Sequence, residues 1–171
     1  PASYRALIAG GWVHYFDCHR PRKRHAGHDF GRSAAGIFDS NVAYVDQHLG
    51  RMFEHLRATG RLDDTIVFII ADHGEAFMEH GAMDHSNKPY ENNTLVPLIV
   101  HAPGEAAARF AQPVGLIDVG PTALGFAGVP ALACYRGVDL RPSALPGGLP
   151  RRPIISETPR NLIESSFYSW A

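Results

Sequence analysis

Residues 65–75 read TIVFIIADHGE, an unbroken apolar run that passes abruptly into charged and polar side chains. The apolar part, residues 65–71, is rich in β-branched side chains and predicts a strand buried on both faces, as in a helix-covered parallel sheet. Residues 95–101 (LVPLIVH) form a second run of this kind, which stops at Pro103-Gly104. Both runs are therefore expected to be buried strands.

The clearest helix signal lies upstream of the first run. Apolar side chains recur at steps of three and four residues, which places them on one face of a helix that would pack on the core. Gly60 is a natural end for this helix, because glycine accepts the left-handed backbone found there. The apolar face consists of Phe38, Val42, Val45, Leu49, Met52, Phe53 and Leu56.

Weaker signals complete the chain. Residues 6–16 and 153–157 resemble strands, and residues 137–149 are rich in Gly and Pro and are expected to be irregular. Residues 118–128 predict a short helix that Asp118 could cap. The alternation of strand, helix and strand predicts an α/β fold, a layered sandwich with a mainly parallel sheet flanked by helices.

Composition excludes several classes of protein. The chain has 171 residues, of which 45% are hydrophobic and 19% are charged, and its formal net charge is −1. Such apolar content is not that of a disordered chain, and no apolar run approaches the roughly 20 residues that span a bilayer. The near-zero charge argues against a nucleic-acid partner, and two cysteines cannot form a disulfide framework.

Both ends of the chain lack the usual features of a terminus. The first residue is Pro1 with no signal peptide before it, and residues 167–171 are an aromatic stretch with no closing turn. We therefore expect residues 1–171 to be a single α/β domain fragment of a longer protein. Localisation stays open, with periplasm and cytoplasm both possible, and so does the oligomeric state.

The chemistry of the chain is expected where the first predicted strand ends. Ligands of open α/β sheets bind beyond the carboxyl ends of strands, which is where Asp72 and His73 lie. Neighbouring residues inside a strand point to opposite faces, so these two could share an ion only if the backbone bends there, and Gly74 permits a sharp turn. A carboxylate with a neutral imidazole suits a divalent cation of intermediate hardness.

An ordered series of motifs extends this signal over more than thirty residues. After the Asp-His-Gly-Glu element at 72–75 come Glu-His-Gly at 79–81, Tyr90-Glu91, the strand at 95–101 and Pro103-Gly104. This series resembles the carboxyl-terminal half of the sulfatase family, within the alkaline phosphatase superfamily. Similar family elements lie on both sides of it: His-Arg-Pro at 19–21, Val45-Asp46, Leu49-Gly50 and residues 117–122 (IDVGPT).

The resemblance assigns roles to five residues. Asp72 and His73 would be two ligands of one divalent metal ion. His19, in the family's H-x-P position, would protonate the leaving oxygen or orient the anion. His85, or Lys88 as a competing candidate, would contact the oxygens of the sulfate or phosphate group and stabilise charge as the ester bond breaks.

The resemblance also shows what this chain does not contain. The family nucleophile, a formylglycine made from C/S-x-P-x-R or a serine or threonine, lies toward the amino terminus together with one or two early metal-binding aspartates. Neither the nucleophile nor these aspartates are found in this chain. Cys18 does not supply the nucleophile motif, because the proline after it comes one place too late. Cys18 is expected to be a packing residue, and the fragment is expected to bind metal weakly and to be inactive by itself.

The function predicted from these features is metal-dependent hydrolysis of sulfate or phosphate esters by the complete protein. The alternatives are a phosphoethanolamine or phosphoglycerol transferase of the same superfamily, and a non-catalytic binding module that keeps the fold. Calcium is the first expectation for the metal, while manganese, magnesium and zinc also fit. The expected partner is a small-molecule or glycan ester, with no nucleic acid and no membrane segment in this part of the protein.

Overall fold

The helices and strands are described in a computed structural model that covers residues 10–85 and 89–157. It contains the helices α1 (Ala34–Ala58), α2 (Glu91–Thr94) and α3 (Val119–Phe126), and the strands β1 (Val67–Ile70), β2 (Ala76–Phe77), β3 (Met83–Asp84) and β4 (Leu98–His101). Single 3-10 turns lie at Leu62–Asp64, Glu79–Gly81, Leu116–Asp118 and Pro142–Ala144. The chain divides into two compact units, the first ending at Asp64 and the second beginning at Thr65.

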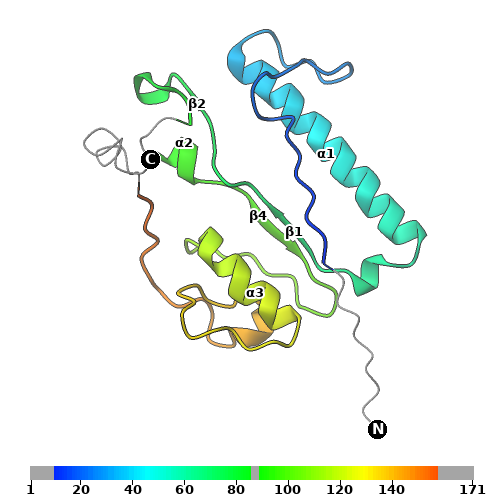
Figure 1. Cartoon of the computed structure of the whole chain (residues 1–171), viewed down its shortest axis with the longest axis vertical. Coiled ribbons are helices and arrows are strands. Elements are labelled where there is room, and N and C mark those ends of the chain that lie inside the picture. The colour runs from blue at the N-terminus through cyan, green and yellow to red at the C-terminus, as the bar shows by residue number, and fades with distance from the viewer. Residues whose placement is uncertain (1–9, 86–88, 158–171) are drawn as a thin grey trace, which may run out of the picture. The chain divides into compact units, whose positions relative to one another are not determined.

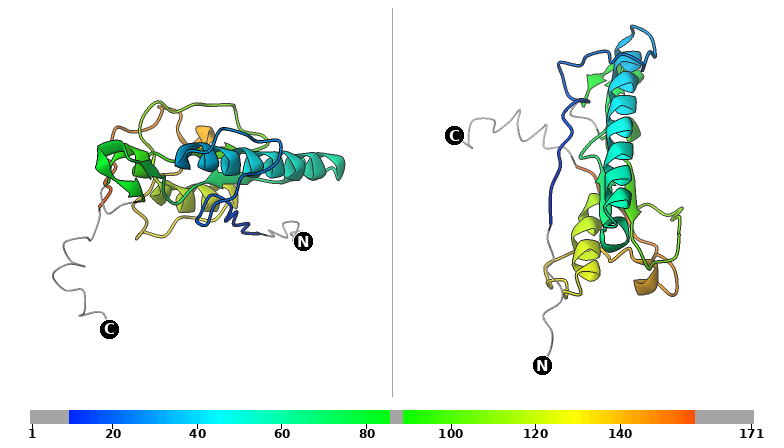
Figure 2. Two further views of the ribbon diagram at one scale, coloured as in Figure 1. Left: turned by 90° about the horizontal axis from the view of Figure 1, so that it is seen from above. Right: turned by 90° about the vertical axis from the view of Figure 1, so that its right-hand side faces the viewer.

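Helix α1 dominates the first unit and is straight throughout its length (Figure 2). The Ser33 hydroxyl caps its amino end by accepting a hydrogen bond from the Gly36 N–H at 3.0 Å. At the other end Gly60 has φ 66°, and the Arg61 N–H reaches back to the Leu56 carbonyl at 2.8 Å. The predicted helix and its glycine stop are therefore confirmed.

The apolar face of α1 is not the buried core that its spacing predicted. Its side chains are half-buried or exposed, and Val42 keeps 44% of its surface. The buried side chains of α1 are polar instead, because the loop before the helix covers Ser40 and Asn41. The His25 N–H donates to the Ser40 hydroxyl at 2.9 Å, and His25 Nε2 lies 3.1 Å from the Asn41 side-chain oxygen.

Two of the weaker strand predictions are wrong in the residues that the structure describes. Residues 10–16, the described part of the predicted strand at 6–16, form no strand, and residues 153–157 have no ladder partner. Apolar character alone does not make a strand, because a strand also needs a neighbour to take its backbone hydrogen bonds. The irregular conformation predicted for 137–149 is confirmed apart from one 3-10 turn.

The second unit is built around β1 and β4, which lie side by side in Figure 1. They pair antiparallel, with Val67 opposite His101 and Ile70 opposite Leu98. Strands β2 and β3 form a separate antiparallel pair. The α/β class is thus present, but a mainly parallel sheet is not confirmed, because both ladders in the described residues are antiparallel. An apolar run predicts a strand, whereas its direction depends on how the connection returns.

Helix α3 lies against β1 through the rings of Phe68 and Phe126, whose centroids are 6.1 Å apart at 72°. Asp118 occupies the N-cap position, as predicted, but its side chain does not cap the helix. The fully buried carboxylate accepts hydrogen bonds from the N–H groups of Val138 at 2.8 Å and Gly115 at 2.9 Å, and pairs with the guanidinium of Arg152.

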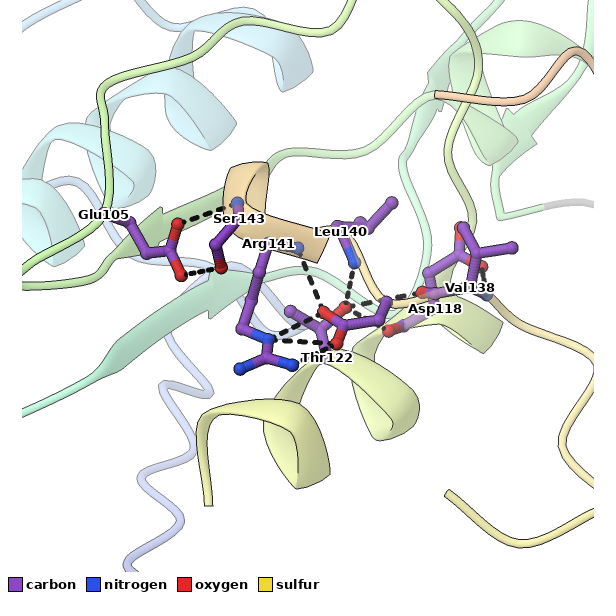
Figure 3. Close-up of polar contacts among 8 residues, drawn as sticks. Glu105, Asp118, Thr122, Val138, Leu140, Arg141 and Ser143 are labelled. Carbon is purple, nitrogen blue, oxygen red and sulfur yellow. Dashed lines mark hydrogen bonds and ion pairs between the residues drawn. The ribbon is translucent and has the colours of Figure 1, made fainter. Parts of the chain in front are cut away.

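Thr122 adds a second link between α3 and the segment after it (Figure 3). Its hydroxyl donates to the Asp118 carbonyl at 2.6 Å and accepts from the Leu140 N–H at 2.9 Å. The buried apolar side chains in the described part of the chain are those of Ala76, Pro121, Leu140 and Leu149. Among the same residues, no helix is both long and apolar enough to cross a membrane. Polar contacts thus hold much of this unit together.

Candidate functional site

The candidate site lies where the chain leaves β1. The strand ends at Ile70, and the backbone bends before Gly74, as the sequence predicted. The side chains of Asp72 and His73 consequently lie on the same side, with Asp72 Oδ2 3.8 Å from His73 Nε2. The other carboxylate oxygen accepts the His73 N–H at 3.0 Å. Both side chains reach solvent, because 80% of the Asp72 side chain and 41% of the His73 side chain are exposed.

A backbone carbonyl orients the His73 ring. Its Nδ1 lies 2.8 Å from the Gly74 carbonyl oxygen, and a carbonyl can only accept a hydrogen bond. Nδ1 therefore donates in this arrangement, and in the neutral ring the lone pair would be on Nε2, which faces Asp72 Oδ2. Two acceptors that face each other in this way fit a cation, and orientation of a ligating histidine by a carbonyl is common at metal sites.

His85 is brought to the same place by the β2–β3 hairpin. In this pair Ala76 lies opposite Asp84 and Phe77 opposite Met83, so the residue after β3 returns to the turn that follows β1. The rings of His85 and His73 lie against each other, with centroids 4.3 Å apart and planes inclined by 30°. Three of the five predicted site residues are therefore neighbours.

Helix α2 contacts this turn through its backbone. The Gly74 N–H donates to the Asn93 carbonyl at 2.8 Å. A Cβ on Gly74 would lie 2.1 Å from the Asn92 carbonyl oxygen, so no other residue fits without moving the backbone. The side chain of Asn92 also contacts Glu79, at 3.4 Å from the amide nitrogen to the carboxylate. Asn92 was not among the predicted site residues, because nothing in its local sequence indicates these contacts.

Glu79 accepts a hydrogen bond from the Phe77 backbone N–H within the hairpin. This bond, rather than a charged neighbour, is the main reason that the pKa of the Glu79 carboxyl lies below its usual value. The side chain is therefore a carboxylate near neutral pH, and acts only as an acceptor. Its contact with α2 joins the hairpin that carries His85 to the helix that supports Gly74.

The structure gives no position relative to this turn for the other two predicted residues. His19 belongs to the unit that ends at Asp64, where its Nδ1 lies 2.7 Å from the Arg20 carbonyl and its ring lies 4.6 Å from that of Phe16. The peptide bond between Arg20 and Pro21 is cis. Lys88 lies outside the described residues. The roles given to His19 and Lys88 therefore remain predictions.

Cys18 is half-buried. Burial raises the pKa of its thiol, and the neighbouring Asp17 carboxylate raises it further, against a smaller opposite effect of Arg22. A raised pKa disfavours the thiolate, which is the nucleophilic form of cysteine. The prediction that Cys18 is not the nucleophile agrees with this environment.

The metal-ligand set near β1 is incomplete in the described part of the chain. No group of three or more His, Cys, Asp or Glu side chains that could hold one ion is present at residues 10–85 and 89–157. Asp72 and His73 fit a divalent cation by donor type and by their mutual orientation, but zinc takes about four ligands and calcium about six to eight. The two side chains alone are too few ligands for either ion.

Comparison with known proteins identifies the motif series. A family model described as Sulfatase matches residues 12–129. Arylsulfatase K of Danio rerio is 31% identical over 150 residues, which are 82% of this chain and 28% of that protein. Choline-sulfatase of Rhizobium meliloti (strain 1021) is 32% identical over 98 residues, which are 57% of this chain and 19% of that protein.

A solved structure supports the same assignment at the level of the fold. BT4656, in complex with its substrate D-glucosamine-2-N,6-O-disulfate, superimposes with a TM-score of 0.53 and 29% sequence identity over 70% of this chain and 26% of that chain. The chain thus spans only about a fifth to just over a quarter of the length of these relatives. The resemblance to sulfatases is confirmed.

Proposed function

The chain belongs to the sulfatase family, and we propose that it is the carboxyl-terminal half of the catalytic domain of a metal-dependent sulfate ester hydrolase. The observation that carries the proposal is the bend after β1, which directs the Asp72 carboxylate and the His73 imidazole toward each other. A predicted strand that continued straight would have separated them onto opposite faces. Family membership supplies the class of reaction, namely hydrolysis of a sulfuric ester.

The proposed roles follow from what each side chain can donate or accept. Asp72 and His73 would hold one divalent cation, calcium in the first instance with manganese, magnesium or zinc as alternatives, together with ligands from elsewhere in the protein. When bound, such a cation would neutralise charge on the ester oxygens and lower the pKa of a nearby nucleophile. The Gly74 carbonyl keeps the lone pair of His73 on Nε2, where it is needed.

The remaining roles concern the ester itself. We assign to His85, or to Lys88, the donation of hydrogen bonds to the non-bridging oxygens, because His85 lies against His73 and is exposed. His19 would protonate the leaving oxygen. The nucleophile would come from a part of the protein that this chain does not contain, since Cys18 lies in no C-x-P-x-R motif and burial disfavours its thiolate.

The proposed substrate is a small-molecule or glycan sulfate ester. The related structure BT4656 binds a doubly sulfated glucosamine, and choline-sulfatase takes its name from a small sulfate ester. Transfer of phosphoethanolamine or phosphoglycerol, and a purely non-catalytic role, are less well supported, because the reported relatives are named as sulfatases. Hydrolysis of a phosphate ester stays a subordinate alternative that the same side chains could serve.

The experiment compares Asp72→Ala and His73→Ala in the full-length protein that contains this chain. We expect each variant to lose bound metal, measured by elemental analysis, and to lose at least about a hundredfold in hydrolysis of an aryl sulfate, since even indirect metal partners cost ten- to a hundredfold. The control is Asp63→Ala, which removes an exposed carboxylate from the 3-10 turn at Leu62–Asp64. Unchanged metal content and activity in both site variants would mean that the assignment is wrong.

A further inference from the structure

The turn between β2 and β3 has a strained backbone. Met78 and His80 have φ values of 79° and 57°, in the left-handed region that residues other than glycine rarely adopt. Within the turn, the Met78 N–H donates to the Ala82 carbonyl at 2.8 Å. Such conformations persist only where contacts with the surrounding structure hold them.

Two side chains of the turn contact the start of α2. The Glu79 carboxylate accepts from the Phe77 N–H and, through a longer contact of 3.4 Å, from the amide of Asn92. The His80 ring stacks on the ring of Tyr90, the N-cap residue of α2, with centroids 4.0 Å apart and planes at 26°. One charged contact and one aromatic contact thus join the hairpin to the same short helix.

Helix α2 is also the element that lies against the turn after β1. The Gly74 N–H is bonded to the Asn93 carbonyl, and the Asn92 carbonyl leaves no room for a side chain on Gly74. The backbone of this helix therefore supports the residues that present His73. Its side chains contact the hairpin that presents His85, so α2 connects the two histidines that face each other at 4.3 Å.

From this arrangement we infer that Glu79 is a positioning residue, which holds the β2–β3 turn on α2 through Asn92 and thereby sets the ring of His85 against that of His73. Its meaning for catalysis rests on the role proposed above for His85. Glu79 need not touch the ester, since it acts through the hairpin. A misplacement of about 1 Å of a group that positions substrate can cost on the order of a hundredfold in rate.

The first experiment measures the placement of His85 independently of activity. In the full-length protein labelled with ¹³C at the histidine rings, we expect Glu79→Ala to shift the His85 resonance, because the neighbouring His73 ring shields it. His85→Ala assigns the signal. Glu79→Gln keeps an oxygen that can accept the Phe77 N–H, so the His85 resonance should keep its wild-type position. Glu91→Ala removes an exposed acid from α2 and should leave the resonance unchanged. An unchanged His85 resonance in Glu79→Ala would overturn the inference.

The second experiment asks whether the placement serves the reaction. We expect Glu79→Ala to lower kcat/KM for an aryl sulfate by about ten- to a hundredfold, with Glu79→Gln close to wild type and bound metal unchanged. In a His85→Ala background the same substitution should cause no further loss, because residues that act as one unit are not additive. Additive losses would overturn the positioning role. A fully active His85→Ala would instead refute the role proposed for His85. The effect of Glu79→Ala on the His85 resonance would then still decide whether Glu79 positions that ring.

Discussion

At the scale of single residues, Gly74 has no room for a side chain. Its N–H is bonded to the Asn93 carbonyl, and the space that a side chain would need is filled by the Asn92 carbonyl. The chain therefore needs glycine here for close approach of two backbones. The same close approach keeps the bend after β1, and with it the convergence of Asp72 and His73.

Gly74→Ala should consequently destabilise the protein and weaken metal binding together. The added methyl group would meet backbone, which cannot rotate away, so we expect a loss of about 1–3 kcal/mol in the free energy of unfolding, as for other overpacked sites. Urea unfolding and calorimetric titration with calcium measure the two effects. Gly50→Ala is the matched control, since a side chain there meets open space in the interior of α1 and should stabilise by about 0.5–1 kcal/mol. Equal behaviour of the two variants would contradict the account of Gly74.

At the scale of elements, α3 illustrates how a correct helix prediction can assign the wrong task to a side chain. Asp118 stands at the N-cap, but its carboxylate binds the Val138 N–H and the Arg152 guanidinium, far away in sequence. Thr122, one turn further on, binds the Leu140 N–H. Figure 3 shows the contacts of Asp118 and Thr122 with Val138 and Leu140. The helix is therefore held in the second unit by buried polar groups.

Asp118→Ala should be one of the most destabilising substitutions in this unit. It leaves Arg152, whose side chain is 17% exposed, without its fully buried partner, and it leaves two backbone N–H groups without an acceptor. Breaking a buried ion pair in this way costs about 3–5 kcal/mol. Chemical unfolding of the full-length protein measures the loss, and Asp63→Ala, which removes an exposed acid, should stay within about 0.5 kcal/mol of wild type. A loss below about 1 kcal/mol for Asp118→Ala would argue against the network.

At the scale of the whole molecule, the described residues do not provide a complete core or a complete site. Four apolar side chains are buried among them, at Ala76, Pro121, Leu140 and Leu149, and no set of three metal ligands is present in the same residues. The chain also spans at most 28% of the relatives compared with it. Under the proposed function, the remaining metal ligands would come from other parts of the protein.

The purified 171-residue chain should accordingly bind calcium at least about a hundredfold more weakly than the full-length protein, because it contributes only part of the six to eight oxygen ligands that calcium takes. Turnover of an aryl sulfate by the chain alone should be undetectable. Calorimetric titration and a spectrophotometric assay test both statements on the same samples. Clear hydrolysis by the isolated chain would show that a nucleophile and a full ligand set lie within it.

Local sequence patterns were sufficient for several features of the fold and the site. The spacing of apolar residues located α1, and Gly60 located the end of that helix. The apolar runs located β1 and β4. Gly74 after a strand correctly indicated the bend that brings Asp72 and His73 together. Each of these depends on the conformational preferences of residues a few positions apart, which any short stretch of chain carries with it.

Tertiary structure alone decided the rest. The antiparallel pairing of β1 with β4, the burial of Ser40 and Asn41 in place of the apolar face of α1, and the partners of Asp118 could not be foreseen. The same holds for the contact of Glu79 with Asn92. All of these join residues that are distant in sequence. Hydrogen-bond donors and acceptors carry no mark of their eventual partner, because one backbone N–H or side-chain oxygen is chemically much like another until folding brings two of them together.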